Sequence, residues 1–194
     1  MLRRWGLVVL VLALVASAAA ARAADPDARP FTVPWSSEPL YGIAPVTHKQ
    51  TLLTPDGTKL FIETWLPAAK DGNVPPDELP TILVITPYVT QGTLESASTR
   101  DLMVSRGYAY SQLHVRGTGE STGCIQMYSQ TEADDGALGI EWVATKSPWG
   151  NGVVGGYGVS YPGGTILNAA ARGAPEKTQY LKAVLAGAPA VSLY

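Results

Sequence analysis

The sequence predicts an α/β fold, in which a mostly parallel sheet carries helices on both faces. Residues 81–85 (Thr-Ile-Leu-Val-Ile) form a continuous apolar run. Such a run is typical of a central strand that is buried on both faces. Segments with strand and helix patterns then alternate from residue 81 to residue 186. This alternation favours parallel strands joined by right-handed helical crossovers.

A β-hairpin over residues 48–67 is the first predicted element. Two β-rich runs flank Thr54-Pro55-Asp56-Gly57, and the Asp-Gly pair of this turn tolerates positive φ. A polar loop over residues 71–80 leads to the buried strand at 81–85. The following elements are expected to be a helix at 95–105, a strand at 108–115, a helix at 132–146, a strand at 153–157, a helix at 162–171 and a strand at 181–186. The expected helix at 132–146 places Ala133, Ala137, Ile140 and Val143 on one side.

The first 47 residues are expected to precede the folded domain. Residues 1–23 have the pattern of a secretory signal peptide: Arg3-Arg4, an apolar run over residues 5–21, and the small-x-small site Ala21-Arg22-Ala23. An uncleaved membrane anchor is the alternative, but the run is shorter than the roughly 20 residues that span a bilayer. Residues 24–47 are rich in proline and predict an extended lead-in. We therefore expect a secreted or periplasmic protein without stable membrane association once the signal peptide is cleaved.

Composition excludes several classes of function. The chain has 14 basic and 16 acidic side chains, so a basic surface for nucleic acid is not expected. Its one cysteine, Cys124, excludes a disulfide framework. No Cys, His and carboxylate residues have the spacing of a metal site, and the glycine-rich loop at 117–123 lacks the Lys-Ser/Thr of a Walker motif. We therefore expect no metal, no cofactor and no nucleic-acid partner.

Residues 156–164 (Gly-Tyr-Gly-Val-Ser-Tyr-Pro-Gly-Gly) lie between a predicted strand and a predicted helix, where a nucleophile elbow belongs. Glycines at 158 and 163 would let strand and helix approach closely, and the turn would lift the Ser160 hydroxyl above the sheet. Ser160 would also lie at a helix N-terminus, whose free N–H groups favour a developing oxyanion. Pro162 replaces the usual second glycine, which a first helical turn tolerates. The alternative is a serine in an ordinary glycine-rich turn.

Residues 48–194 resemble the first half of the α/β-hydrolase domain in the cocaine esterase and Xaa-Pro dipeptidyl-peptidase family, which also includes the α-amino-acid ester hydrolases. The matching motifs are spread over most of this range, so together they are more specific than the elbow alone. They are Asp56-Gly57, Thr86-Pro87-Tyr88, Val115-Arg-Gly-Thr-Gly-Glu-Ser-Thr-Gly123, Glu141-Trp142, Ser147-Pro-Trp-Gly-Asn-Gly152 and Gly158-Val-Ser-Tyr-Pro-Gly163.

The resemblance implies a serine hydrolase that acts on a small-molecule ester or peptide substrate through an acyl-enzyme. It implies that Ser160 is the nucleophile, that the Tyr161 backbone N–H is one oxyanion donor, and that the Tyr88 hydroxyl is the other. A packing tyrosine in a loop is the alternative for Tyr88. The oligomeric state and the choice between ester and peptide stay open.

Other polar and aromatic residues are expected to be structural. The Arg116 guanidinium, with five donors, is expected to bind backbone carbonyls. His114 stands where members of the family commonly carry Asp, but the family's strand order would place it two strands from Ser160, about 9–10 Å away. That separation exceeds hydrogen-bond reach, and His48 would be farther still. The aromatic residues expected to pack in the core are Trp142, Trp149 and Tyr157.

The order of catalytic residues in α/β-hydrolases is Ser, then Asp or Glu, then His, but Glu176 is the only acid after Ser160 and no histidine follows. We therefore expect the N-terminal part of a longer hydrolase, inactive alone, with a sheet truncated after about its sixth strand. Such a sheet would expose an apolar edge, and Cys124 would be free or paired beyond residue 194. The alternative is a non-catalytic secreted module that retains the fold.

Overall fold

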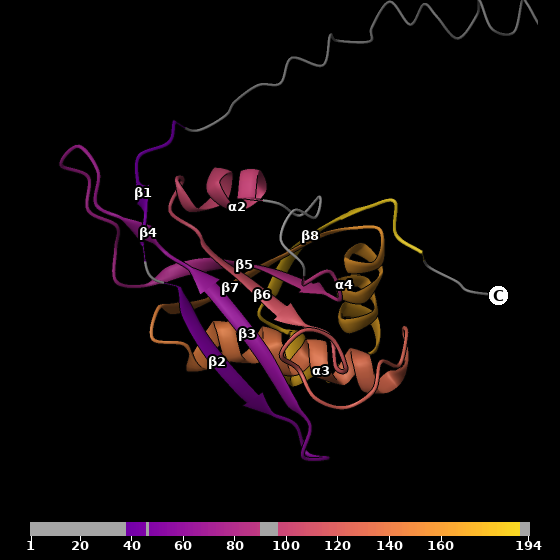
Figure 1. Cartoon of the computed structure of the whole chain (residues 1–194). Coiled ribbons are helices and arrows are strands. Elements are labelled where there is room, and N and C mark those ends of the chain that lie inside the picture. The colour runs from indigo at the N-terminus through magenta and orange to yellow at the C-terminus, as the bar shows by residue number, and fades with distance from the viewer. Residues whose placement is uncertain (1–37, 46, 90–96, 191–194) are drawn as a thin grey trace, which may run out of the picture. The chain divides into compact units, whose positions relative to one another are not determined.

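The computed structural model describes residues 38–45, 47–89 and 97–190. The predicted signal peptide and the first part of the predicted lead-in lie outside these ranges. In chain order the elements in Figure 1 are β1 (Gly42–Ile43), β2 (His48–Leu53), β3 (Lys59–Trp65), β4 (Pro67–Ala68), β5 (Leu79–Thr86), α2 (Ala97–Val104), β6 (Ala109–His114), α3 (Gln130–Glu141), the π-helical turn η1 (Trp142–Lys146), β7 (Gly150–Val159), α4 (Tyr161–Arg172), α5 (Pro175–Thr178) and β8 (Leu181–Gly187).

One six-stranded sheet organises these elements, in the order β2-β3-β6-β5-β7-β8. Strands β2 and β3 form the predicted antiparallel hairpin, with Gly57 of its turn at a φ of 82°, and β3 pairs antiparallel with β6. Strands β6, β5, β7 and β8 are parallel. The predicted mostly parallel sheet is therefore confirmed. Strand β8 lies at one edge of the described sheet, where Leu185 is 61% exposed.

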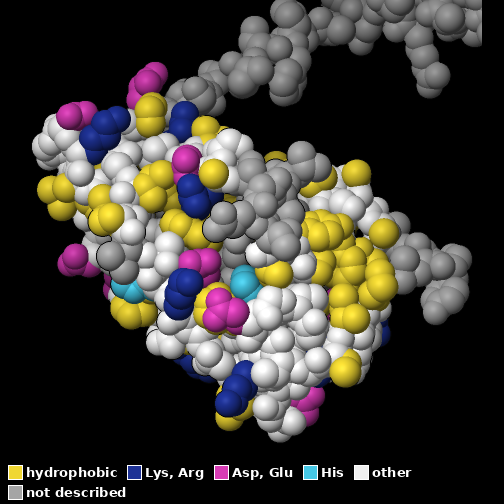
Figure 2. Space-filling model, in the orientation of Figure 1, with side chains coloured by type: hydrophobic (Ala, Val, Ile, Leu, Met, Phe, Trp, Pro, Cys, Tyr) yellow, Lys and Arg dark blue, Asp and Glu magenta, His cyan; other side chains and the backbone are white. Residues whose placement is uncertain are grey.

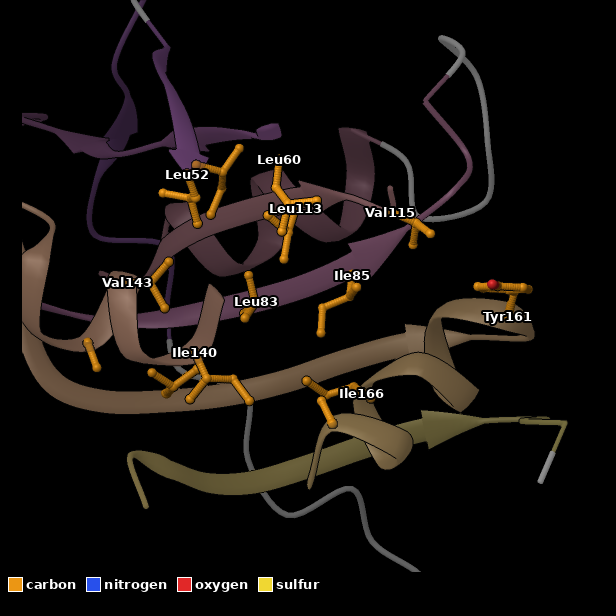
Figure 3. Packing of buried hydrophobic residues seen from close by; sticks show 14 residues of the cluster. Leu52, Leu60, Leu83, Ile85, Leu113, Val115, Ile140, Val143, Tyr161 and Ile166 are labelled. Atoms are coloured by element: carbon orange, nitrogen blue, oxygen red, sulfur yellow. The ribbon is translucent and has the colours of Figure 1, made fainter. Parts of the chain in front are cut away.

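Helices cover both faces of the sheet, as predicted (Figure 1). Strand β5 shows how the two faces are separated, because its side chains alternate. Leu83 and Ile85 belong to a cluster with residues of α3 and α4, whereas Val84 packs with Val104 of α2. Figure 3 shows the first cluster extending from Leu52 in the hairpin towards Ile166 in α4. The continuous apolar run at 81–85 thus has the two-sided burial that it predicted.

The predicted helix at 132–146 begins earlier than expected and changes geometry near its end. Its predicted apolar stripe is buried, but the last five residues form the π-helical turn η1. The Ser147 N–H bonds the Trp142 carbonyl at 2.9 Å, five residues back, and the Ser147 hydroxyl bonds the Val143 carbonyl, also at 2.9 Å. These hydrogen bonds widen the final turn. The spacing of apolar residues in the sequence does not predict this change in helix geometry.

A two-stranded sheet of β1 and β4 is an element that the sequence analysis did not predict. It pairs Gly42 with Ala68 and Ile43 with Pro67. Strand β1 lies within the predicted extended lead-in, so this part of the lead-in is a paired strand.

The three aromatic residues predicted to pack in the core do so. Trp142 and Trp149 meet edge to face with ring centroids 5.9 Å apart, and Tyr157 packs against the cluster on the α2 face. His48 lies against Trp149 at 5.2 Å between ring centroids. Among the helices that the structure describes, none has the length and apolar character needed to cross a membrane.

Candidate active site

Ser160 occupies the sharp junction between β7 and α4, as the elbow motif predicts. Its backbone has a φ of 64° and a ψ of −125°, a sparsely populated conformation for a non-glycine residue. The residue is exposed. Its N–H bonds the Gly187 carbonyl at 2.8 Å, and its carbonyl accepts the Gly164 N–H at 3.1 Å. Both backbone groups are therefore fixed, while the side chain is presented to solvent.

Glycines allow the strand and the helix to meet at this junction. A Cβ at Gly158 would lie 2.4 Å from the carbonyl carbon of Pro162 and 2.6 Å from the nitrogen of Gly163. A Cβ at Gly163 would lie 3.0 Å from the Gly158 carbonyl oxygen. The atoms in the way are backbone atoms, which cannot rotate aside. The close approach predicted for Gly158 and Gly163 is confirmed.

Gly158→Ala is expected to destabilise the protein by about 3 kcal/mol, because the added methyl overpacks a junction of backbone atoms. Urea unfolding measures the change. Gly42→Ala is the matched control, since its Cβ would have no neighbour nearer than 3.7 Å, and it is expected to change stability by less than about 0.5 kcal/mol. Equal stability of the two variants would contradict the close packing at the elbow.

Tyr161, the first residue of α4, directly follows Ser160. Its N–H belongs to the first helical turn, whose N–H groups have no partner within the helix. The Tyr161 ring stacks on Tyr128 with ring centroids 4.8 Å apart. Burial and the neighbouring Glu132 raise the pKa of the Tyr161 hydroxyl, which therefore remains protonated. The predicted oxyanion donor thus lies in a well-packed helix start.

Tyr88 follows the end of β5, next to the strand that leads to Ser160. Its side chain is 40% exposed, and its N–H bonds the Thr86 hydroxyl at 3.0 Å. Burial is the main cause that raises the pKa values of Tyr128 and Tyr161. Because β5 and β7 are neighbouring parallel strands, Tyr88 and Ser160 follow the same ends of adjacent strands.

Glu132 and Tyr128 also contact the start of α4, although neither was predicted from the sequence as a site residue. Glu132 is 2% exposed and accepts the Tyr161 hydroxyl at 2.5 Å and the Tyr128 N–H at 2.6 Å. Ser129, three residues earlier, forms the N-cap of α3. The Ser-x-x-Glu pattern is a capping-box signature, so a start of the helix at residue 130 could have been found. The contact with Tyr161 could not, because it joins residues distant in sequence.

Arg116 is structural, as expected, but its partners correct the prediction. Among the residues that the structure describes, it binds two carboxylates and a hydroxyl in place of the expected backbone carbonyls. Its Nε and Nη2 donate to the two oxygens of Asp135 at 2.6 and 2.8 Å, and its Nη1 donates to Asp56 at 3.0 Å. The guanidinium is 4% exposed, and Asp135 holds its pKa above the ordinary value. Arg116 thereby joins the hairpin turn, through Asp56, to α3, through Asp135. The two parallel hydrogen bonds to Asp135 are a strong, charge-assisted arrangement.

Neither histidine is placed to serve Ser160. Strand β5 lies between β6, which carries His114, and β7, so the predicted two-strand separation is confirmed. His114 packs against Phe61 at 4.8 Å between ring centroids, and burial lowers its pKa. His48 is at the start of β2, the edge strand far from β7. Both side chains have structural neighbours instead.

Apolar side chains are exposed over α4 and in the loop that leads to Tyr128. Figure 2 shows hydrophobic side chains gathered over the part of the surface where Figure 1 draws α4. Ile125 and Met127 are 46% and 51% exposed, and they lie in the loop that leads to Tyr128.

The sequence of this domain matches a known family. Residues 56–194 match the X-Pro dipeptidyl-peptidase (S15) family. The chain belongs to this family. The S15 match includes Tyr88, Ser160 and Tyr161 and covers more than half of the chain. It agrees with the resemblance that the motifs indicated.

Relatives and solved structures agree with the S15 assignment. A predicted serine esterase of Mycobacterium bovis is 32% identical over 126 residues, which are 56% of this chain and 19% of the relative. The chain thus spans about a fifth of that relative's length. An α-amino acid ester hydrolase has a TM-score of 0.63 at 23% identity, covering 88% of this chain and 30% of its own. A CocE/NonD family hydrolase from Staphylococcus aureus has a TM-score of 0.58 at 26% identity, covering 71% and 27%. The fold is therefore that of an α/β-hydrolase, and the family is one of esterases and peptidases.

Proposed function

We propose that this S15 family chain is the nucleophile-bearing N-terminal part of a secreted serine hydrolase that cleaves ester or peptide bonds. Ser160 Oγ attacks the acyl carbon, its proton passes to a base, and the carbonyl oxygen becomes an oxyanion. The Tyr161 N–H and the Tyr88 hydroxyl donate to that oxygen. Collapse expels the alcohol or amine with a proton, and water releases the acyl group from Ser160. The substrate is a small ester or peptide.

The single observation that carries this proposal is the exposed Ser160 at a positive φ of 64°, on a strand-to-helix turn. Strain at such a turn is a feature of nucleophile elbows. In α/β-hydrolases the histidine base follows the nucleophile in the chain, and residues 161–194 contain no histidine. In the proposed reaction the base is therefore supplied by a part of the protein beyond residue 194. The 194-residue chain alone is accordingly expected to be inactive.

A non-catalytic secreted module is the second candidate, and the observation that favours it is that residues 161–194 contain no histidine. The reading frame past codon 194 separates the two. An in-frame continuation that encodes an Asp and then a His supports the hydrolase, and a genuine stop codon at that point supports the module.

The substrate class is tested on the full-length gene product. An Ala-Pro chromogenic amide and a short acyl ester are compared at equal enzyme concentration. Faster turnover of the amide assigns the protein to the dipeptidyl-peptidase branch, and faster turnover of the ester assigns it to the esterase branch. If the full-length product carries Asp and His and turns over neither compound, the proposed function is wrong.

Tyr88→Phe is expected to reduce kcat about 10²–10³-fold, because it removes one hydrogen bond to the oxyanion while retaining the ring. The ester KM should change little. Tyr157→Phe is the matched control, since Tyr157 packs on the α2 face of the sheet, and it should retain the wild-type kcat. If Tyr88→Phe also retains the wild-type kcat, Tyr88 is only a packing residue.

A further inference from the structure

A hydrogen-bonded group of three residues lies beside the elbow, and we call Glu132, Tyr128 and Tyr161 the Glu132 clamp. Each carboxylate oxygen of Glu132 accepts one hydrogen bond, Oε1 from the Tyr161 hydroxyl at 2.5 Å and Oε2 from the Tyr128 N–H at 2.6 Å. The tyrosine rings stack with an interplanar angle of 26°. The buried carboxylate therefore joins the start of α4 to the loop before α3.

The clamp does more than cap α3. The Ser129 hydroxyl already accepts the Glu132 N–H at 3.1 Å. In a capping box the glutamate returns to the N–H of the N-cap residue. Here it reaches the residue before the N-cap, and also Tyr161, 29 residues away. Burial raises the pKa of Glu132, and the two hydrogen bonds oppose that rise. A buried carboxylate is tolerated only when its oxygens are satisfied, so the two tyrosines keep Glu132 in place.

Tyr128 has a strained backbone with a φ of 50°. Such a conformation persists only when several contacts fix it. Besides the bond to Glu132, its carbonyl accepts Arg172 Nη1 at 2.9 Å. Its ring covers Gly164, where a Cβ would lie 2.6 Å from a ring atom. Tyr128 is thus held from several sides, and it supports the ring of Tyr161.

We propose that Glu132 is a positioning residue of this hydrolase, which orients the Tyr161 N–H toward the oxyanion by holding the Tyr161 side chain through the clamp. This inference rests on the proposed function. The side chain and the N–H of Tyr161 share one Cα at the first position of α4, so a shift of the ring tilts the donor. An oxyanion donor acts over a narrow range of about 2.7–3.1 Å. A tilt should therefore reduce the stabilisation of the transition state more than it reduces substrate binding. It should accordingly lower kcat more than it raises KM.

The test uses the full-length protein, a short acyl ester and three clamp variants. Tyr161→Phe keeps the ring and the N–H but loses the hydroxyl. Glu132→Gln has one carbonyl oxygen to accept one of the two hydrogen bonds. Each is expected to lower kcat roughly tenfold, a part of the effect of losing an oxyanion donor, with KM within about twofold. The double variant should be no slower than the slower single variant, because both changes break one unit. A short alkyl boronic acid, which forms a tetrahedral adduct, should bind more weakly by the same factor as kcat falls.

Ser129→Ala is the matched control, because it removes the cap of α3 and leaves the carboxylate contacts intact. It should keep kcat within about twofold. If the clamp variants keep the wild-type kcat while Ser160→Ala abolishes turnover, the positioning role is wrong and the proposed function stands. An equal fall of kcat in Ser129→Ala and Glu132→Gln would also overturn it, since the effect would then be the stability of α3. Undiminished turnover by Ser160→Ala would overturn both.

Discussion

Ser160→Ala in the full-length protein is expected to abolish ester hydrolysis, with a loss of kcat of about 10⁶-fold. The hydroxyl oxygen is the atom that attacks the acyl carbon in the proposed reaction, and alanine has no group that can replace it. The side chain is exposed, so stability should change little. Initial rates with a short acyl ester measure the effect, and urea unfolding checks the fold.

Ser105→Ala serves as the control for Ser160→Ala. Ser105 follows the end of α2, and its hydroxyl donates to the Leu102 carbonyl at 3.2 Å. This variant should keep the wild-type rate. If Ser160→Ala instead keeps a rate close to that of Ser105→Ala, another residue is the nucleophile.

Arg116→Met is expected to destabilise the protein by about 3–5 kcal/mol, because it leaves the buried Asp135 carboxylate without its charge partner. Asp135 is 6% exposed as a residue and is bound through both oxygens. Urea unfolding measures the loss. Lys146→Ala, which removes an exposed pair with Glu141 at 3.2 Å, should cost less than about 0.5 kcal/mol. Similar losses of stability in the two variants would show that burial of the Arg116–Asp135 pair adds nothing to its effect on stability.

Asp56 gives the Arg116 network a pH dependence of known sign. Hydrogen bonds from Thr54, Thr58 and Arg116 hold the pKa of Asp56 below its ordinary value of 3.8. A carboxyl whose pKa is lowered by folding stabilises the protein above the unfolded pKa and loses that effect as the pH falls. The stability difference between wild type and Asp56→Asn should therefore be constant at neutral pH and shrink below a pH of about 4. A stability difference that grows on acidification would contradict a lowered pKa of Asp56 in the folded protein.

The regular parts of the fold could be predicted because local patterns report them directly. The apolar run at 81–85 identified a strand covered on both faces, and Leu83 and Val84 do face opposite clusters. The glycines around Ser160 identified the junction of β7 and α4, since few other sequences allow that approach. The family resemblance supplied the strand order, which local patterns do not contain.

The features that escaped prediction depend on contacts between distant residues. Arg116 binds Asp56 and Asp135, which are 60 and 19 residues away. Glu132 binds Tyr161, which is 29 residues away. Single positions on an apolar or polar stripe do not indicate such partners. The pairing of β1 with β4 also joins distant residues. It could not be predicted, because two-residue strands carry no recognisable alternation of apolar and polar residues.

Covalent trapping tests the central proposal that Ser160 forms the acyl-enzyme. The full-length protein is incubated with a fluorophosphonate, and the modified residue is located by peptide mass mapping. The account predicts one phosphonyl adduct, on the peptide that carries Ser160, together with loss of ester hydrolysis in proportion to labelling. Labelling of a different residue, or complete labelling of Ser160 with hydrolysis unchanged, would contradict it.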